Sequence, residues 1–290
     1  MHGKLCVITG ATSGIGLAAA EALARLGARL VLVGRDPLRG ERALDRLRAR
    51  TPGVQAEFRL ADLQLIGETR RLGSELASKY PRIDVLINNA GAQFEKRALT
   101  EEGLERTFAL NHMSYFALTQ SLLDTLLASV PSRIVNVSSR AHVGTLLDFE
   151  DLNLEKDYRG WTAYSRSKLA NILFTRELAR RLGGTGVTAN SLHPGFVASR
   201  FGYNNSLPFR IKLFMAKRWA ISAAKGAETV VHLASAASLE TVSGAYFEKS
   251  APAPPSAAAQ DDAIARRLWD VSAGIADRAA ARRGISPASR

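Results

Sequence analysis

The sequence predicts an α/β fold, a doubly wound parallel sheet of about seven strands with helices on both faces. Three observations predict it. Short apolar segments alternate along the chain with longer segments of helical periodicity. A turn with three closely spaced glycines follows the first apolar segment. The chain has 290 residues, of which 46% are hydrophobic, and this suffices for one large core without disulfides.

Seven short segments have the length and composition of buried strands. They are Lys4–Thr9, Arg29–Val33, Val54–Arg59, Val85–Asn88, Arg133–Val137, Val187–Leu192 and Gly244–Phe247. The segments between them carry apolar residues at helical spacing. The predicted helices are Gly14–Leu26, a charged helix ending near Arg50, Leu65–Lys79, Leu104–Leu127, Ala163–Leu182 and Ala223–Ala236. The strictly alternating order indicates a parallel sheet, because parallel neighbours need helical crossovers.

No internal repeat divides the chain, so we expect one catalytic domain over residues 1–249. The Pro/Ala-rich stretch 250–260 is expected to be a surface loop. It leads to a short helix over Asp262–Ala273 and a frayed tail, and 250–290 should pack on, or trail from, the same domain. Apolar positions on the predicted helix Ala163–Leu182 suit a subunit interface or internal packing equally well. The sequence therefore leaves a monomer and a homo-oligomer open.

The composition excludes several classes of protein. The net charge is +12, but the arginines are scattered and no aromatic-plus-basic module accompanies them, so no nucleic-acid partner is expected. A single cysteine, Cys6, excludes a disulfide within the chain, and the simplest prediction is a cytoplasmic protein. No apolar run approaches the roughly 20 residues of a membrane span. The histidines His112, His142 and His193 are isolated in sequence, which predicts no metal site.

The glycine turn suits a dinucleotide. Gly10, Gly14 and Gly16 lie between a strand and a helix, where glycines allow a tight turn and a helix N-terminus attracts phosphate. The spacing differs from G-x-G-x-x-G, and a turn without ligand remains an alternative. At the end of the second strand, Gly34 and Arg35 stand where an acid would bind the ribose of NAD. A small residue before a cation favours the 2′-phosphate of NADP, unless Arg35 only begins the next helix.

A second pair suits acid–base chemistry. Tyr164 and Lys168 are four residues apart, so on a helix they share one face. A phenol has a reference pKa of about 10 and needs a nearby positive charge to ionise near neutral pH. A lone Y-x-x-x-K pair is a weak signal, and its companions decide the interpretation.

Those companions resemble the short-chain dehydrogenase/reductase family over nearly the whole chain. The resemblance rests on "TGATSGIG" (9–16), "DL" (62–63), "NNAG" (88–91), Asn111, "IVNVSS" (134–139), "YSRSK" (164–168) and "HPGFV" (193–197). It implies a single-domain Rossmann fold and a nicotinamide cofactor, with NADP(H) preferred and NAD(H) the alternative. The implied cofactor-binding residues are Gly10, Thr12, Ser13, Gly14, Ile15, Gly16, Arg35, Asp62, Leu63, Asn89, Ala90, Gly91, Tyr164, Lys168, Pro194, Gly195, Val197 and Ser199.

The resemblance also implies the catalytic residues Asn111, Ser139, Tyr164 and Lys168. Ser139 is preferred to Ser138 because the family places its serine second in the pair, and alternation along the strand sends Ser138 to the other face. Ser139 would bind the substrate oxygen and Tyr164 would exchange its proton. Lys168 would hold the ribose and lower the tyrosine pKa, while Asn111 would support a water path to Lys168.

Three further features look like the retinol-dehydrogenase-like branch of that family. Ser139 and Tyr164 are 25 positions apart, with an inserted segment between them, and "SKLAN" (167–171) and "LWDVS" (268–272) follow. The segment 201–220 is apolar, aromatic and basic, so it is expected to form a lid near 200–222 over a bulky apolar substrate. Contact of this lid with an anionic membrane surface stays open, as does simple packing on the core.

The sequence thus predicts an NADP-dependent oxidoreductase that interconverts a carbonyl and an alcohol, a carbonyl reductase or dehydrogenase of small molecules. Three other functions are less favoured. A protochlorophyllide-reductase-like enzyme is disfavoured because Cys6 lies in the first strand. A sugar-nucleotide epimerase is disfavoured by the glycine spacing. A redox sensor that holds NADP(H) without turnover has no need of Ser139, Tyr164 and Lys168 together.

Overall fold

The computed structural model describes residues 1–197, 206 and 220–282 and contains one eight-stranded sheet. Its strands are β1 (Leu5–Thr9), β2 (Arg29–Gly34), β3 (Ala56–Leu60), β4 (Val85–Asn88), β5 (Ser132–Val137), β6 (Val187–His193), β7 (Tyr246–Glu248) and β8 (Ala251–Pro252). Their order is β3-β2-β1-β4-β5-β6-β7-β8. All neighbours are parallel except β7 and β8. The predicted doubly wound α/β fold is confirmed, with one short antiparallel edge strand in the stretch expected to be only a loop.

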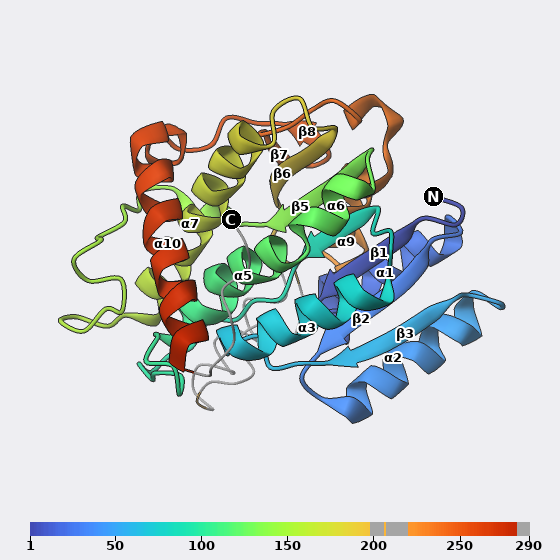
Figure 1. Ribbon diagram of the computed structural model, residues 1–290, viewed down its shortest axis with the longest axis horizontal. Helices are drawn as coiled ribbons and strands as arrows, with labels where there is room; N and C mark the ends of the chain where they lie inside the picture. The colour runs from blue at the N-terminus through green and yellow to red at the C-terminus, as the bar shows by residue number, and fades with distance from the viewer. Residues whose placement is uncertain (198–205, 207–219, 283–290) are drawn as a thin grey trace.

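Helices cover both faces of this sheet (Figure 1). They are α1 (Gly14–Arg25), α2 (Pro37–Arg50), α3 (Ile66–Lys79), α4 (Arg106–Phe108), α5 (Ser114–Ser121), α6 (Leu123–Ala128), α7 (Gly160–Arg181), α9 (Ala223–Ser235) and α10 (Asp262–Arg282). Short 3₁₀ turns occupy η2 (Arg140–His142), η4 (Ala237–Leu239) and η5 (Ala257–Gln260). One apolar cluster joins the sheet to α1, α2 and α9. A second joins it to α3, α5, α6 and α7.

The strands divide their side chains between these two clusters, as strand geometry requires. On β1, Val7 belongs to the cluster of α3, α5 and α7, whereas Ile8 belongs to that of α1 and α9. Both side chains are fully buried. Because the central strands have no solvent face, their sequences are continuously apolar, and this made them recognisable.

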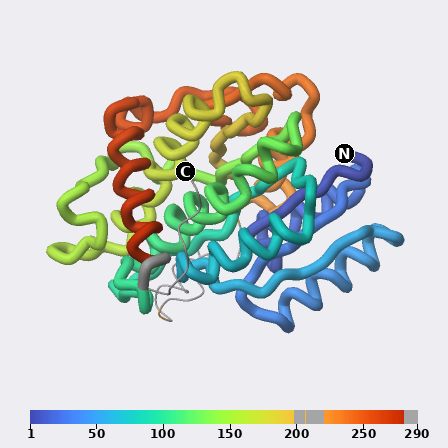
Figure 2. Tube along the Cα trace, viewed as in Figure 1, coloured from blue at the N-terminus to red at the C-terminus, as the bar shows by residue number. Residues whose placement is uncertain are grey.

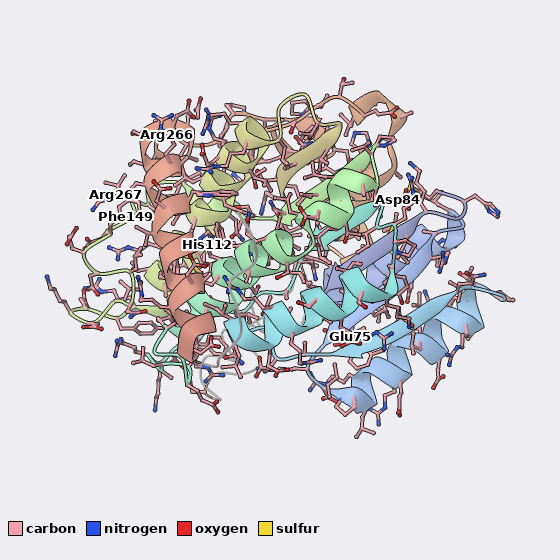
Figure 3. The ribbon with its side chains drawn as sticks, in the orientation of Figure 1. Glu75, Asp84, His112, Phe149, Arg266 and Arg267 are labelled. Carbon is pink, nitrogen blue, oxygen red and sulfur yellow. The ribbon has the colours of Figure 1, made fainter. Side chains whose placement is uncertain are left out.

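Helix α10 adds a layer outside α7 (Figure 2). The Trp269 ring stacks on Phe174 of α7 at 5.9 Å, and the Arg181 guanidinium lies 4.3 Å from the Trp269 ring centroid. Arg267 of α10 lies 4.3 Å from the ring of Phe149 in the inserted segment, and Figure 3 shows the two side by side. The apolar positions of α7 that suited either explanation are therefore covered from within the chain. The helix also extends beyond the predicted Asp262–Ala273.

The helix predicted over Leu104–Leu127 is interrupted. A π-helical turn, η1 (Ala109–Met113), separates α4 from α5, and Leu122 separates α5 from α6. The π turn contains Asn111, one of the expected catalytic residues. Most of the expected lid, residues 200–222, lies outside the described residues.

The ends of β1 and β4 are joined by one hydroxyl. Thr9 is buried, and its Oγ1 accepts hydrogen bonds from the backbone N–H groups of Asn89 (2.9 Å) and Ala90 (3.0 Å). In return the Asn89 side chain donates to the Thr9 carbonyl at 2.8 Å. These bonds lock the turn after β4 against the glycine turn after β1.

We expect Thr9→Val to lower the free energy of unfolding by about 2–4 kcal/mol, because it leaves two backbone N–H groups without an acceptor. Thr9→Ser keeps the hydroxyl and should lose only about 1 kcal/mol, for one methyl group. Urea titration of the three proteins measures the difference. Equal losses in the two variants would contradict the role of the hydroxyl.

Candidate active site

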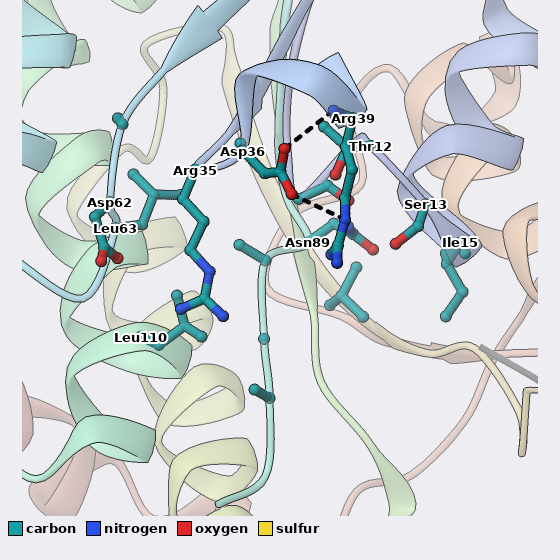
Figure 4. Close-up of a pocket in the computed structure, with 18 of the residues that line it drawn as sticks. Thr12, Ser13, Ile15, Arg35, Asp36, Arg39, Asp62, Leu63, Asn89 and Leu110 are labelled. Atoms are coloured by element: carbon teal, nitrogen blue, oxygen red, sulfur yellow. Dashed lines mark hydrogen bonds and ion pairs between the residues drawn. The ribbon is translucent and has the colours of Figure 1, made fainter. Parts of the chain in front are cut away.

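A cavity of about 440 Å³ runs along the carboxyl edge of the sheet (Figure 4). Ligands of open α/β sheets bind at this edge. Most of the expected cofactor residues line it: Gly10, Thr12, Ser13, Gly14, Ile15, Arg35, Asp62, Leu63, Asn89, Ala90, Gly91, Tyr164, Lys168 and Pro194. Residues from β1 to β6 therefore meet around one space, although they are distant in sequence.

The glycine turn leaves this space open. Gly10 has φ +65°, and a Cβ there would lie 2.8 Å from the Cα of Ala90. Gly16 does not line the cavity, but a Cβ on it would lie 2.6 Å from the Gly10 carbonyl oxygen. Its role is to let α1 approach the turn closely. Ser13 is the N-cap of α1 and its side chain makes no capping hydrogen bond.

The first turn of α1 thus presents backbone N–H groups that no side chain caps, directed as a helix N-terminus directs them. Such a turn fits the pyrophosphate of a dinucleotide. The residues present therefore suit a nicotinamide cofactor, which Gly10, Ser13, Gly14 and Ile15 would hold by their backbone.

Two cations lie where the adenosine end of the cofactor is expected. Arg35 is exposed at the end of β2, and in Figure 4 its side chain extends toward Leu110, between the Asp62–Leu63 segment and Asn89. Asp36 caps α2 by accepting the N–H of Arg39 at 3.1 Å, and its carboxylate pairs with the Arg39 guanidinium at 3.0 Å. Asp36 is thus the N-cap of α2, and Arg35 lies just before the helix. Arg39 also lines the cavity and was not predicted.

The Asp62–Leu63 pair closes the same end of the cavity. The Asp62 carboxylate is occupied by the backbone N–H and side chain of Gln64, at 3.0 and 3.2 Å. This local turn fixes the direction in which the chain leaves β3.

At the other end of the cavity the lining includes Ser138, Tyr164 and Lys168, and Ser139 lies next to Tyr164 without lining the cavity itself. The Ser139 hydroxyl lies close enough to the Tyr164 phenol to act on the pKa of that phenol. Ser139 also accepts the N–H of Ala141 at 3.2 Å, as the N-cap of η2. The Ser138 hydroxyl points elsewhere and donates to the Lys168 carbonyl at 2.6 Å. The two serines thus have different partners: the Ser138 hydroxyl bonds the backbone of α7, whereas the Ser139 hydroxyl lies near the Tyr164 phenol.

Lys168 is buried, and its Nζ donates to the Val137 carbonyl at 2.9 Å. Nζ lies 5.6 Å from the centre of the Tyr164 ring. Burial lowers the pKa of Lys168 to about 7. Burial also raises the pKa of Tyr164 to about 12, although the interaction with Ser139 acts to lower the tyrosine pKa. In the chain by itself, the expected lowering of the tyrosine pKa by Lys168 is absent, because desolvation dominates.

Asn111 is tied into a fixed position beside Lys168. Its Oδ1 accepts the N–H of Ala92 at 2.8 Å, and its Nδ2 donates to the Ala92 carbonyl and to the Ser167 hydroxyl, both at 2.9 Å. A Cβ on Gly91 would lie 3.2 Å from Asn111 Oδ1 and 3.4 Å from Lys168 Nζ. Glycine at this position keeps the floor of the cavity open between the two side chains.

The segment after β6 packs on Ile221, near the end of the expected lid. Gly195 has φ +90°, and a Cβ there would lie 2.6 Å from Cδ1 of Ile221. Val197 forms an isolated β-bridge with Ile221. Neither Gly195 nor Val197 lines the cavity. Ser199 lies outside the described residues.

Large apolar side chains are exposed on the segments next to the proposed catalytic residues in sequence. Five of them flank the catalytic segments: Val143 and Leu146 follow Ser139, Trp161 precedes Tyr164, and Phe196 and Ile221 flank the expected lid. The Trp161 ring is 59% exposed and lies 5.8 Å from the Tyr164 ring.

Comparison with known proteins agrees with this site. Residues 4–206 match the short chain dehydrogenase family. Retinol dehydrogenase 14 of Homo sapiens is 44% identical over 288 residues, covering 94% of this chain and 86% of that protein. Retinol dehydrogenase 13 of Homo sapiens is 40% identical over 279 residues, covering 94% of this chain and 84% of that protein.

Solved structures agree as well. A crystal structure of an uncharacterized protein from Mycobacterium Paratuberculosis has a TM-score of 0.77 and 34% identity, covering 95% of this chain and 94% of that one. The RhlG/NADP active-site complex of Pseudomonas aeruginosa has a TM-score of 0.69 and 26% identity, covering 85% and 94%. Within the described residues, no helix combines the length and apolarity needed to cross a bilayer. The chain thus belongs to the short chain dehydrogenase family, whose members bind NAD(P)(H), and within it to the retinol-dehydrogenase-like branch of oxidoreductases acting on a CH–OH/C=O pair.

Proposed function

We propose that this protein is an NADP(H)-dependent oxidoreductase that interconverts a bulky apolar aldehyde or ketone with its alcohol. The observation that carries the proposal is that Tyr164 and buried Lys168, with Ser139 next to the phenol, share one cavity with the glycine turn. A nicotinamide bound along that cavity would supply or accept the hydride.

The side chains then have separate roles. Ser139 holds the substrate oxygen and stabilises the charge that develops on it. Tyr164, whose pKa burial raises to about 12, is a neutral phenol at pH 7 and hence a proton donor for carbonyl reduction. Lys168, with a pKa lowered to about 7, lies next to the phenol and can carry a proton near neutral pH. Asn111 fixes the surroundings of Lys168.

Preference for NADP is supported by the charges at the adenosine end. Arg35 and Arg39 are both exposed, and both line the cavity. The acid at this end, Asp36, is held by Arg39. A phosphate would gain charge-assisted hydrogen bonds here, whereas a ribose hydroxyl pair would find no unengaged carboxylate. The exposed apolar side chains Val143, Leu146 and Trp161 support an apolar substrate, because water-exposed apolar groups near a site favour apolar ligands.

We expect Tyr164→Phe to abolish turnover, with kcat reduced at least about 1000-fold, because proton transfer loses its donor. The Kd for NADPH, measured by fluorescence titration, should stay within about threefold, since the change removes one oxygen far from the phosphates. The assay is NADPH consumption across a panel of aliphatic and aromatic aldehydes and ketones. Wild-type binding of NADPH without turnover of any carbonyl compound would instead identify a redox sensor.

We expect Arg35→Ala to raise the KM for NADPH about 10–100-fold, because the variant loses one charge-assisted contact with the 2′-phosphate, which contributes about 1.5–3 kcal/mol. The KM for NADH should change less than about threefold on the same scale. Arg42→Ala is the matched control, because Arg42 is an exposed arginine of α2 that does not line the cavity. Equal changes for NADPH and NADH would contradict the NADP preference.

The low pKa of Lys168 has a consequence for stability. The unfolded chain holds the Lys168 proton up to pH 10.5 and the folded chain only to about 7, so protonation favours unfolding between these values. The unfolding free energy of wild type minus that of Lys168→Met should therefore rise with pH from 7.5 to 9.5. The slope should be about 1 kcal/mol per pH unit. The Val137 carbonyl keeps Asn171 as donor in this variant. A pH-independent difference would show that Lys168 is not desolvated.

A further inference from the structure

Two histidines bind the peptide group that follows Ser139. Nδ1 of His142 lies 2.6 Å from the Ser139 carbonyl oxygen, and Nδ1 of His193 accepts the N–H of Arg140 at 3.3 Å. This carbonyl and this N–H belong to the same peptide unit, between residues 139 and 140. One imidazole comes from the turn η2 and the other from the last residue of β6.

These contacts begin where the sheet ends. The N–H of Ser138 still bonds the Leu192 carbonyl at 2.8 Å, as an extension of the β5–β6 ladder. The peptide unit between residues 139 and 140 lies beyond this ladder and needs other partners for its polar groups. The backbone N–H of His142 gives the Ser139 carbonyl a second, longer bond of 3.2 Å. The Arg140 N–H has His193 as its acceptor.

The two bonds require opposite neutral tautomers. A carbonyl can only accept, so His142 carries its proton on Nδ1, and its Nε2 accepts the backbone N–H of Ser256 at 3.1 Å. A backbone N–H can only donate, so Nδ1 of His193 is bare and its proton lies on Nε2. Charging either ring would place a proton on a nitrogen that now accepts a bond.

The surroundings keep both rings neutral. His142 is buried, with its ring 5.3 Å from the Tyr246 ring. Burial lowers the pKa of His142 and lowers that of His193 to about 4, and the Arg140 guanidinium acts in the same direction on both. The Glu248 carboxylate acts to raise both histidine pKa values. This carboxylate accepts a hydrogen bond from the Tyr246 hydroxyl at 3.1 Å and pairs with the Arg140 guanidinium at 3.7 Å.

We propose that His142 and His193 are positioning residues, which clamp the Ser139–Arg140 peptide and thereby hold the Ser139 hydroxyl toward Tyr164 and the substrate oxygen. The inference rests on the proposed function of Ser139. His142 extends the clamp to Ser256, so the segment between β8 and η5 also supports the position of the serine.

The first test uses NADPH-dependent reduction of decanal by the full chain. His142→Leu and His193→Leu remove the bonding nitrogen, and kcat should fall about 10–100-fold, as expected for a displaced catalytic group. The Kd for NADPH should stay within about threefold. Asn is the matched variant at both positions, since its amide reaches the place of Nδ1 and can donate or accept there. His142→Asn and His193→Asn should recover most of kcat.

A double-mutant cycle separates positioning from general damage. In a Ser139→Ala background, itself expected to lose about 100-fold in kcat, the Leu substitutions should cost less than about threefold more. An undiminished loss in that background would overturn the proposal, as would Leu variants with unchanged kcat. If His142→Leu does not fold, His193→Leu carries the same test, because this side chain is half-buried.

Histidine ¹⁵N NMR of the wild-type chain tests the clamp without substrate. We expect His142 as the Nδ1–H tautomer and His193 as the Nε2–H tautomer at pH 7, assigned with the two Asn variants. A shared tautomer or a charged ring would overturn the clamp. If instead Ser139→Ala keeps full activity while the tautomers are as expected, the proposed function of the serine fails and the clamp stands as a structural feature.

Discussion

The carbonyl of Val137, the last residue of β5, is the point on which both fold and chemistry depend. It receives Lys168 Nζ at 2.9 Å, Asn171 Nδ2 at 3.3 Å and the Tyr115 hydroxyl at 3.5 Å. These donors come from α7 and α5, so one acceptor fixes both helices at the end of the strand. Tyr164 lies one helical turn before Lys168, and its place beside Ser139 follows from this anchorage. The geometry of the proposed catalytic residues thus depends on a backbone oxygen.

Several buried polar side chains lie near the carboxyl ends of β4 and β5, and burying them lowers the stability of the fold unless they are hydrogen-bonded. Asn88 of β4 bonds Asn136 of β5 at 2.9 Å, and Asn136 bonds Thr175 of α7 at the same distance. Each such bond contributes only about 1 kcal/mol net, yet leaving one partner alone costs more. Buried Lys168 has a lowered pKa for the same reason, the loss of water around its charge. Stability and function compete here, and side chains that suit the reaction are kept where apolar ones would pack better.

Local sequence was enough to predict the strands and the glycine turn, because continuous apolar runs and a strand-to-helix turn are local signals. Motif order was enough to predict the family. The π turn at Asn111 was missed, since one extra residue in a helical turn hardly alters hydrophobic periodicity. The full length of α10 and its seat on α7 depend on contacts between distant segments. The hydrogen bond of Lys168 could not be predicted for a similar reason: its acceptor is a backbone carbonyl of β5, which no side-chain pattern records.

The insertion between Ser139 and Tyr164 and the C-terminal helix form one structural unit. Arg267 of α10 reaches Phe149 and pairs with Glu150 at 3.0 Å, and Leu147 and Phe149 pack on a cluster that contains Leu268. The exposed ion pair contributes little by itself, so the apolar contact carries this association. Both segments flank α7, whose first turns bear Tyr164 and Lys168. The long insertion and the "LWDVS" segment occur together in this chain for a physical reason: each covers apolar surface that the other exposes, and both pack on the helix that bears the proposed catalytic pair.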